Sequence, residues 1–428
     1  MKIYSVLKSL FILFIIVSTI FANGVLQEVQ TKMDEGDYKS AMELIKPYIE
    51  DNPELPQAQF VAGKIFYQLG YINEAKVAVD KSINLDRANQ EYRDFRNEMA
   101  SFATQYTEAS RAQKDGKYSE AKDKYAELLE INGNFAQGYF NYAQVLFQLD
   151  DAKLGSDALK KAMELRPEDE NYVKAYSMYG QKFLVDGNSL LQRRDYTRAT
   201  AKFKQALILD PQDYKAYFLM ARAYQSEKNY PAALEAIDNC LSIQDDYIRA
   251  YVVKGSVYIR MNKMNDAIAA FTKITELDRK YYSAWDKIGY INYRIKEYDA
   301  AIPAYNEAIK IDPSKSNPYE NLGVIFSEKQ DWDNAIQNLT KASELNTKES
   351  TVWYRLASAY NAKGEAQNAK VAANEALKNK PNWAAPLYEL GIAERRLGNN
   401  DAAKNAFRMA AKDPKWKKSA EFELNSIK

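Results

Sequence analysis

The chain has 428 residues, of which 59 are Lys or Arg and 58 are Asp or Glu. Because the charges balance to within one, no overall electrostatic field favours nucleic acid or an anionic membrane as the partner. Histidine is absent and Cys240 is the only cysteine, which excludes a Ser-His-Asp triad, a Cys-His pair, a histidine metal site and an intramolecular disulfide. We therefore expect no catalytic residues, no metal and no cofactor.

The amino-terminal segment, Met1–Ala22, has the pattern of an export signal. Lys2 and Lys8 supply positive charge, and Leu10–Phe21 form an apolar run. This run is short for a membrane span, which needs about 20 residues. We predict that residues 1–22 are a signal peptide cleaved after Ala22, and that the mature chain is exported to the periplasm or cell envelope. The alternative is an uncleaved anchor in the inner membrane, with the body of the protein outside the cytoplasm.

From Ala22 onward a 34-residue frame can be laid over the chain. Its first four units form a predicted amino-terminal array over residues 22–169. Residues 90–101 are extra within this array, but they contain neither Pro nor Gly and carry Tyr92 and Phe95 at helical spacing. We therefore predict that they lengthen the first helix of a unit and do not form a flexible linker.

Seven further units fill residues 170–417, where 171–179 form a second helical extension of the same kind. The register is clearest in three consecutive units, in which the residues at each of three positions match one another. These are Trp285, Tyr319 and Trp353, then Gly289, Gly323 and Ala357, then Ala301, Ala335 and Ala369. Residues 418–428 are predicted to form a capping helix with its lysines facing outward, as the end of a stacked array requires.

Each unit has the pattern of two helices of roughly a dozen residues, with apolar positions three and four apart. In the unit that begins at residue 316 the break falls at Lys329-Gln330-Asp331. Small residues stand where helices must approach closely, and we expect Gly323 and Ala335 to face each other. By the same logic Cys240, at a position that alanine fills in other units, is expected to be small and buried. One unit cannot bury its apolar face alone, so neighbours must stack.

This pattern resembles the tetratricopeptide repeat, a 34-residue unit in which an aromatic residue, Leu-Gly, Tyr, Ala, Phe, Ala and Pro recur at fixed offsets. The near match consists of Tyr319, Leu322-Gly323, Phe326, Ala335, Leu339 and Ala342. The resemblance covers about eleven units. It implies an all-α fold, an α-solenoid in which antiparallel helix pairs form a right-handed superhelix.

The resemblance also implies a partner-binding groove, because repeat positions 2, 5, 9, 12 and 13 of the family line the concave face. In the amino-terminal units these positions give a polar, nearly uncharged lining of Gln57, Lys64, Gln68, Gln137, Gln144 and Gln148. In the central units they give cations between aromatic rings, at Lys215, Phe218, Arg222, Arg249, Arg260, Tyr290, Tyr293 and Arg294. Arginine binds carboxylates with two parallel hydrogen bonds and aromatic walls bury side chains, so this strip is predicted to bind acidic and aromatic segments.

These observations favour an exported, non-catalytic scaffold that binds protein or peptide segments in its groove. The alternative is a structural subunit of a cell-envelope assembly, such as a secretion, outer-membrane or motility apparatus, that uses its convex surface and ends. Recognition of a partner's terminal carboxylate is not expected, because Glu320 and Val324 occupy positions where the family's carboxylate clamp needs Lys and Asn. We expect no nucleic-acid partner, and no membrane contact beyond a possible amino-terminal anchor.

Overall fold

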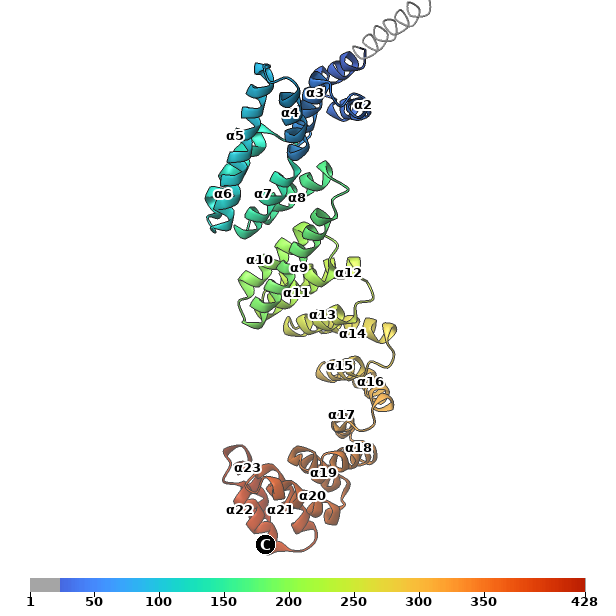
Figure 1. Cartoon of the computed structure of the whole chain (residues 1–428). Helices are drawn as coiled ribbons and strands as arrows, with labels where there is room; N and C mark the ends of the chain where they lie inside the picture. Colours follow the sequence, from blue (N-terminus) through green and yellow to red (C-terminus); the bar gives the residue numbers. More distant parts are fainter. Residues whose placement is uncertain (1–23, 428) are drawn as a thin grey trace, which may run out of the picture. The chain divides into compact units, whose positions relative to one another are not determined.

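The computed structural model describes residues 24–427, and over this range the regular structure is helical, with no strand (Figure 1). The predicted signal peptide, residues 1–22, lies outside the described residues. None of the helices in the described part of the chain is both long and apolar enough to cross a membrane. The expected all-α fold is confirmed.

The chain divides into two compact units, one ending at Ala216 and the other beginning at Tyr217. In the first, residues 24–34 are helical and are followed by α2 (Tyr38–Asp51), α3 (Pro56–Gln68), α4 (Ile72–Leu85), α5 (Gln90–Lys114), α6 (Tyr118–Ile131), α7 (Ala136–Gln148), α8 (Ala152–Leu165), α9 (Glu170–Gln192) and α10 (Tyr196–Leu209). Helix α11 (Tyr214–Ser226) spans the division.

The second unit continues with shorter helices of similar length. They are α12 (Tyr230–Ile243), α13 (Ile248–Arg260), α14 (Met264–Leu277), α15 (Tyr282–Arg294), α16 (Tyr298–Ile311), α17 (Ser316–Glu328), α18 (Trp332–Leu345), α19 (Ser350–Lys363), α20 (Ala366–Asn379), α21 (Ala384–Arg396), α22 (Asn400–Ala410) and α23 (Pro414–Ser426). In this unit α13, α15 and α17 lie on one side of the stack and α14, α16 and α18 on the other (Figure 1).

The two extra segments lengthen helices, as predicted. Helix α5 has 25 residues and α9 has 23, whereas α6 and α10, which follow them, have 14 each. Because no Pro interrupts residues 90–101 or 171–179, the helical hydrogen bonds continue through both segments. A helix stands at the predicted capping position, but it begins and ends earlier than the predicted range 418–428, because α23 spans Pro414–Ser426. Lys415, Lys417 and Lys418 are exposed on it.

A left-handed residue ends the first helix of every repeat. The residues with positive φ in the described part of the chain are Gly36, Gly70, Gly116, Asp150, Arg194, Lys228, Asn262, Lys296, Gln330, Gly364 and Gly398. All of them occupy position 15 of the predicted 34-residue frame, so the backbone confirms the register in all eleven units. At each one the next amide closes a six-to-one hydrogen bond, as from Asp331 N to Phe326 O at 2.9 Å, which satisfies a carbonyl at the helix end.

In six of the eleven repeats position 8 is a glycine, and a Cβ there would collide with the side chain at position 24. A Cβ added to Gly289 would lie 2.8 Å from the Tyr305 ring, and one added to Gly323 would lie 2.5 Å from Leu339 Cγ. The sequence placed Ala335 opposite Gly323. That residue contributes only its carbonyl oxygen, at 3.3 Å, because the larger Leu339 fills the contact.

The small side chains of the second helices are buried between neighbouring repeats. Ala301, Ala308, Ala335 and Ala342 are fully buried, and so is Cys240, as predicted. From α2 to α10, and again from α12 to α23, each helix packs on the next one, both within a repeat and from a second helix to the following first helix. Apolar burial is therefore shared between neighbours along the chain, which is how a stacked array without a single central core is stabilised.

In the first unit a loop from one repeat is held against the end of a helix from another. The Asn132 amide donates to the Tyr67 carbonyl at 2.6 Å, and the Asn134 amide donates to the Gln68 carbonyl at 2.8 Å. Gly70 lies beneath this loop. A Cβ there would stand 2.8 Å from the carbonyl carbon of Asn134 and closer still to its oxygen.

Replacing Gly70 with Ala should destabilise the protein far more than replacing Gly116 with Ala. Both glycines have nearly the same φ, +75° and +74°, but a Cβ at Gly116 meets nothing within 4 Å. Left-handed strain of about 1 kcal/mol is therefore common to both variants, and overpacking adds about 1 to 3 kcal/mol at Gly70 alone. Thermal and urea unfolding of the two variants measure the difference. Equal losses would contradict the account of the loop contact.

A carboxyl group is buried near the carboxyl end of the second unit without an ion-pair partner among the described residues. Glu389 is 7% exposed and accepts a hydrogen bond from the Asn361 amide at 2.8 Å. Burial raises the pKa of the Glu389 carboxyl above its usual range, although hydrogen bonds from Asn361 and Ser358 and the charge of Arg396 act in the opposite direction. The ionised form is thus disfavoured in the folded state.

Replacing Glu389 with Gln should raise the melting temperature at pH 7, because the amide keeps the shape and the acceptor without the buried charge. The wild-type protein binds this proton more tightly when folded, so its stability should fall as pH rises from the ordinary glutamate pKa through the raised one. The advantage of the variant should therefore shrink as pH is lowered through that window. Melting curves from pH 4 to 8 test this, and a constant difference would rule it out.

Candidate functional site

Seven of the eight predicted groove residues lie in the second unit, on α11, α13 and α15. The remaining one, Lys215, belongs to the first unit, where its ammonium lies 5.8 Å from the Tyr214 ring centroid. Lys215, Arg222, Arg249, Arg260, Tyr290 and Arg294 are exposed and Tyr293 is half-buried, whereas Phe218 is buried. The six exposed side chains are thus accessible to a partner.

Phe218 supports the arginines around it and is itself only 4% exposed. The Arg249 guanidinium lies 5.1 Å from the Phe218 ring centroid and that of Arg222 lies 5.9 Å from it. Tyr247 packs edge-on against the same ring at 5.1 Å. Because a cation is attracted to a ring face, Phe218 orients two guanidinium groups while both stay in contact with solvent.

A second group of cations and rings lies on α15. Tyr290 is 36% exposed, and Arg294 and Lys287 lie 5.9 Å and 5.7 Å from its ring centroid. Tyr293 stacks on Tyr298 with centroids 6.2 Å apart. This arrangement keeps positive charge next to aromatic surface, as the sequence predicted.

Tyr293 also lines a cavity of about 580 Å³ between the first helices of successive repeats. The other lining residues are Val324, Ser327, Glu328, Gln330, Trp332, Tyr354, Arg355, Ser358 and Ala359. The cavity has aromatic and hydroxyl groups on its walls, so it could accept a ring or a short polar side chain.

The arginines fall into two sets that differ in their partners. Within the described residues Arg222, Arg249, Arg260 and Arg294 form no ion pair. Farther along, Arg355 is paired with Glu320 at 2.6 Å, Arg395 is paired with Glu423, and Arg396 donates to the Asn361 carbonyl. Arg193, Arg194, Arg279 and Arg408 also form no ion pair among the described residues. Arg222, Arg249 and Arg294 differ from these four because each lies beside an aromatic ring.

Two carboxyl groups also occupy groove positions in this unit. Burial raises the pKa of Asp286 on α15, which forms no ion pair with a described residue. Burial also raises the pKa of Glu320, although its ion pair with Arg355 acts in the opposite direction. Among the described residues, neither carboxyl group forms an ion pair with Arg222, Arg249, Arg260 or Arg294, because Glu320 is paired with Arg355 and Asp286 is unpaired.

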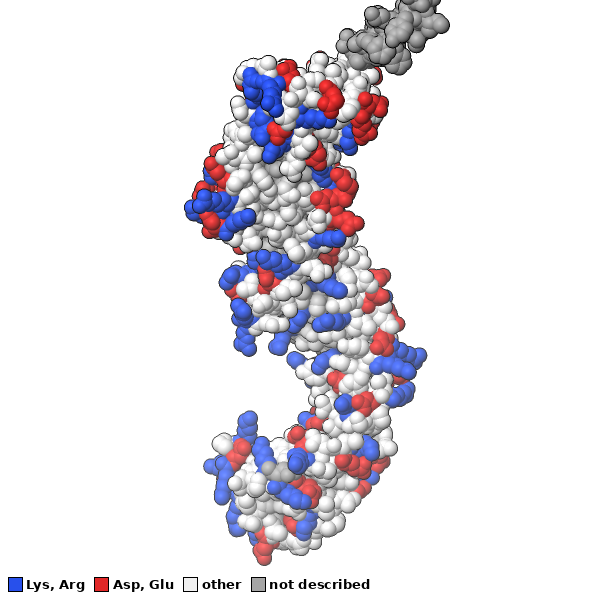
Figure 2. All heavy atoms as spheres, in the orientation of Figure 1, with Lys and Arg blue, Asp and Glu red and all other residues white. Residues whose placement is uncertain are grey.

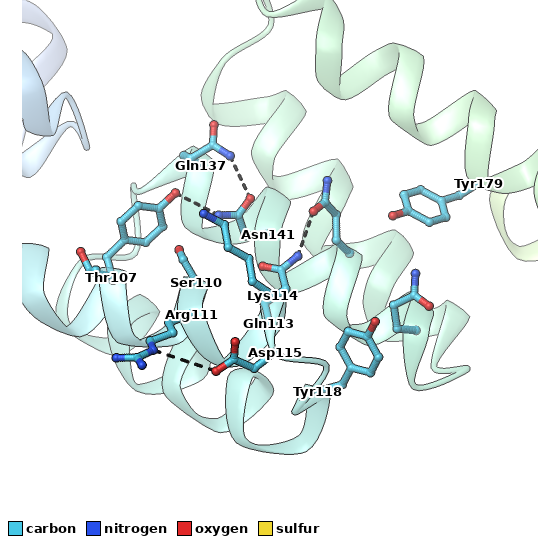
Figure 3. A pocket seen from close by; sticks show the side chains of 13 residues that line it. Thr107, Ser110, Arg111, Gln113, Lys114, Asp115, Tyr118, Gln137, Asn141 and Tyr179 are labelled. Carbon is cyan, nitrogen blue, oxygen red and sulfur yellow. Dashed lines mark hydrogen bonds and ion pairs between the residues drawn. The ribbon is translucent and has the colours of Figure 1, made fainter.

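The first unit holds a different site, which is larger and mostly uncharged. Its cavity of about 830 Å³ is lined by residues of α5, α6, α7 and α9 (Figure 3). Of the six residues that the sequence placed in the polar groove lining of this unit, Gln137, Gln144 and Gln148 line the cavity. Gln57, Lys64 and Gln68 do not. Figure 2 shows that uncharged side chains cover much of the visible face of this unit, between charged margins.

Sequence reasoning missed the contribution of α5 to this cavity. Tyr106, Ser110, Gln113 and Lys114 line it and stand at repeat positions 5, 9, 12 and 13. The same positional rule, applied to the third unit, would have found them. In the described part of the chain no group of His, Cys, Asp or Glu side chains is arranged to hold a metal ion.

Family models match the chain at several places and in the predicted register. Models described as tetratricopeptide repeat match residues 190–250 and, separately, residues 56–89, 136–169, 248–281 and 350–382; another, described as TPR repeat, matches 289–329. Together they cover just over half of the chain. A comparison with curated protein sequences gave no match.

Solved structures with similar folds include several repeat proteins. The crystal structure of MamA is 24% identical, covering 39% of this chain and 96% of that one, with a TM-score of 0.36. The crystal structure of YrrB, described as a TPR protein with an unusual peptide-binding site, is 18% identical in sequence, with a TM-score of 0.39. The match covers 43% of this chain and 95% of that one. A tetratricopeptide repeat protein from Parabacteroides merdae is 12% identical in sequence, with a TM-score of 0.41. The match covers 58% of this chain and 98% of that one.

The 34-residue register of the repeats shows which family the chain belongs to. Eleven left-handed residues recur at one position of a 34-residue frame, and family models begin at the same frame boundaries, as at residues 56, 136 and 248. Its fold is the all-α solenoid of helix pairs that this frame predicts. The chain therefore belongs to the tetratricopeptide repeat family, whose members bind peptide or protein partners.

Proposed function

We propose that this chain is an exported, non-catalytic scaffold that binds acidic and aromatic protein segments on the cationic face of α11, α13 and α15. Repeats of this family build scaffolds for protein–protein interaction, which supports the general role. The finer assignment rests on one observation, the unpaired arginines of these three helices.

The unpaired arginines favour an acidic partner because each guanidinium has donors that no described carboxylate engages. A carboxylate can accept two parallel hydrogen bonds from one guanidinium, in a geometry that lysine cannot provide. Phe218 and Tyr290 hold Arg222, Arg249 and Arg294 beside their rings before any partner arrives. Less side-chain entropy is then lost on binding.

The aromatic preference rests on the tyrosines of the same face. Tyr290 is exposed, and Tyr293 lines the 580 Å³ cavity together with Tyr354. A ring from the partner could pack against these rings and bury apolar area there, while its neighbouring carboxylates bind the arginines. The ligand is thus a segment in which acidic and aromatic residues lie close together.

Export is proposed from the amino-terminal sequence alone. Lys2, Lys8 and the apolar run Leu10–Phe21 have the order of a signal peptide. The partner would then be a protein of the periplasm or cell envelope. An uncleaved anchor in the inner membrane would leave the same groove facing the same compartment.

Changing Arg222, Arg249 and Arg294 together to Ala should weaken the binding of a peptide that alternates Glu and Tyr. Exposed ion pairs contribute about 0.7 kcal/mol each, so we expect a loss of about 2 kcal/mol, or about thirty-fold in Kd. Fluorescence polarisation with the labelled peptide measures it. Affinity of the wild-type protein should also fall as salt is raised.

A matched control separates this site from the overall charge. Arg193, Arg194 and Arg408 are exposed on other elements, and their joint replacement by Ala removes the same charge. That variant should bind the peptide as the wild type does. If both triple variants bound the peptide as tightly as the wild type does, or if both bound it equally weakly, the proposed groove site would be wrong.

The signal peptide is tested separately. In a bacterial host, the recovered mature protein should begin at Asn23 and be released when the outer membrane is permeabilised. Replacing Ile15 and Ile16 by Asp interrupts the apolar run and should leave the precursor inside the cell. Mass spectrometry of the fractions measures both. An intact amino terminus in the membrane fraction would support the anchor instead, and a cytoplasmic wild-type protein would contradict export.

A further inference from the structure

A long cleft follows α5 in the first unit. A second cavity of about 440 Å³ shares Tyr106, Thr107 and Gln137 with the 830 Å³ cavity, so the two adjoin each other. Their lining extends along α5 from Phe102 and ends at its C-cap residue, Asp115. At 1.5 Å per residue this is about 20 Å of helix, which matches about six residues of extended peptide.

Two chains of hydrogen bonds fix the amide groups that line the larger cavity. In one, the Tyr125 hydroxyl donates to Gln113 Oε1 at 2.8 Å, and Gln113 Nε2 donates to Gln144 Oε1 at 3.0 Å. In the other, Gln137 Nε2 donates to Asn141 Oδ1 at 2.9 Å, and Asn141 Nδ2 donates to the Tyr106 hydroxyl at 2.9 Å. Figure 3 shows Gln113, Gln137 and Asn141, which belong to these two chains, around the same opening.

Each chain of hydrogen bonds ends in groups that remain open to a ligand. Among the described residues, Gln144 Nε2 and the Tyr106 hydroxyl proton are unused donors, and Gln137 Oε1 is an unused acceptor. A peptide group offers one carbonyl acceptor and one N–H donor. The cleft therefore presents the complement of an extended main chain, on side chains already held in place by their neighbours.

The charged side chains that line the cleft nearly balance, with Arg111, Lys114 and Arg166 against Glu74 and Asp115. In the smaller cavity the Arg166 guanidinium lies over the Tyr71 ring, 3.3 Å from its centroid. Arg111 and Asp115 lie 4.0 Å apart and neutralise each other at the margin of the larger cavity. Lys114 forms no ion pair with a described residue, and its ammonium can donate to main-chain carbonyls. The amide groups of Gln113, Asn141 and Gln144 carry no net charge.

The rings favour a peptide over a glycan. Tyr179 is only 7% exposed, and its ring lies 4.2 Å from that of Phe147. Tyr106 packs edge-on against Phe135, with centroids 5.2 Å apart. Tyr106 and Tyr179 are therefore packed against protein rings, and their hydroxyl groups line the cleft as hydrogen-bonding groups. Of the tyrosines that line the larger cavity, only Tyr118, which is half-exposed, has no ring packed against it among the described residues.

We infer that the first unit binds an uncharged, extended peptide segment through hydrogen bonds to its main chain. The site is separate in residues and in chemistry from the cationic face proposed on the second unit, and it does not depend on that proposal. Recognition of the main chain makes the site tolerant of ligand sequence. Because the ligand is uncharged and the charges of the lining nearly balance, its affinity should depend little on salt.

The test uses the full chain and a capped, fluorescently labelled peptide of about eight residues made of Ser, Thr, Asn and Gln, a length set by the cleft. The Asn141→Leu, Gln144→Leu double variant should bind it about thirty-fold more weakly, since two to three net hydrogen bonds are lost. The control replaces Gln105 and Gln192, exposed amides on α5 and α9 outside the cleft lining, by Leu. It should bind as the wild type does.

A peptide methylated at alternate main-chain nitrogens should not bind, and raising salt from 0.15 to 0.5 M should change the affinity less than two-fold. The variant in which Arg222, Arg249 and Arg294 are replaced by Ala should bind the neutral peptide as the wild type does. The experiment therefore distinguishes an error in the proposed cleft site from an error in the proposed cationic face. Absent binding, equal binding by the cleft variant or by the methylated peptide, or displacement by a neutral oligosaccharide would each overturn the inference. Circular dichroism confirms that the variants are folded.

Discussion

The close approach of two helices inside each repeat is the constraint on which the structure depends. A glycine at position 8 lets the side chain at position 24 reach the backbone of the first helix, as Gly289 does for Tyr305 and Gly323 for Leu339. The apolar area buried there belongs to one repeat. Because the opposite face of each second helix must also be covered, burial continues from repeat to repeat.

Glycine at the turn between the two helices can be required by the local backbone conformation or by a tertiary contact, and the repeats show the difference. Left-handed backbone recurs in all eleven repeats, but Asp150 and Gln330 adopt it without glycine, so the conformation alone does not demand that residue. At Gly70 the loop at Asn134 removes the space for any side chain. The same loop lies next to the cleft of the first unit, which joins the stability of this region to the shape of its binding surface.

Two surfaces of different chemistry are built from one repeat pattern. In the first unit, amides along α5 and α7 hydrogen-bond to one another and leave alternating donors and acceptors open. In the second, arginines on α11, α13 and α15 lie beside rings without carboxylate partners among the described residues. Helix geometry fixes where these side chains project, so substitutions at a few positions change the partner while the stacking stays the same.

The sequence by itself determined the period, the helix pairs and the lengthened helices α5 and α9, because glycine, alanine and aromatic spacing encode contacts within a single repeat. It also predicts Arg222 and Arg294 at groove positions, and both side chains are exposed beside aromatic rings. Tertiary structure decided which side chains are available. Phe218 is buried, Arg355 and Arg395 are neutralised by Glu320 and Glu423, and the amides of α5 meet those of α7. These outcomes depend on pairings between residues 16 to 35 positions apart, and a repeat pattern specifies the position of a side chain but not the partner it finds there.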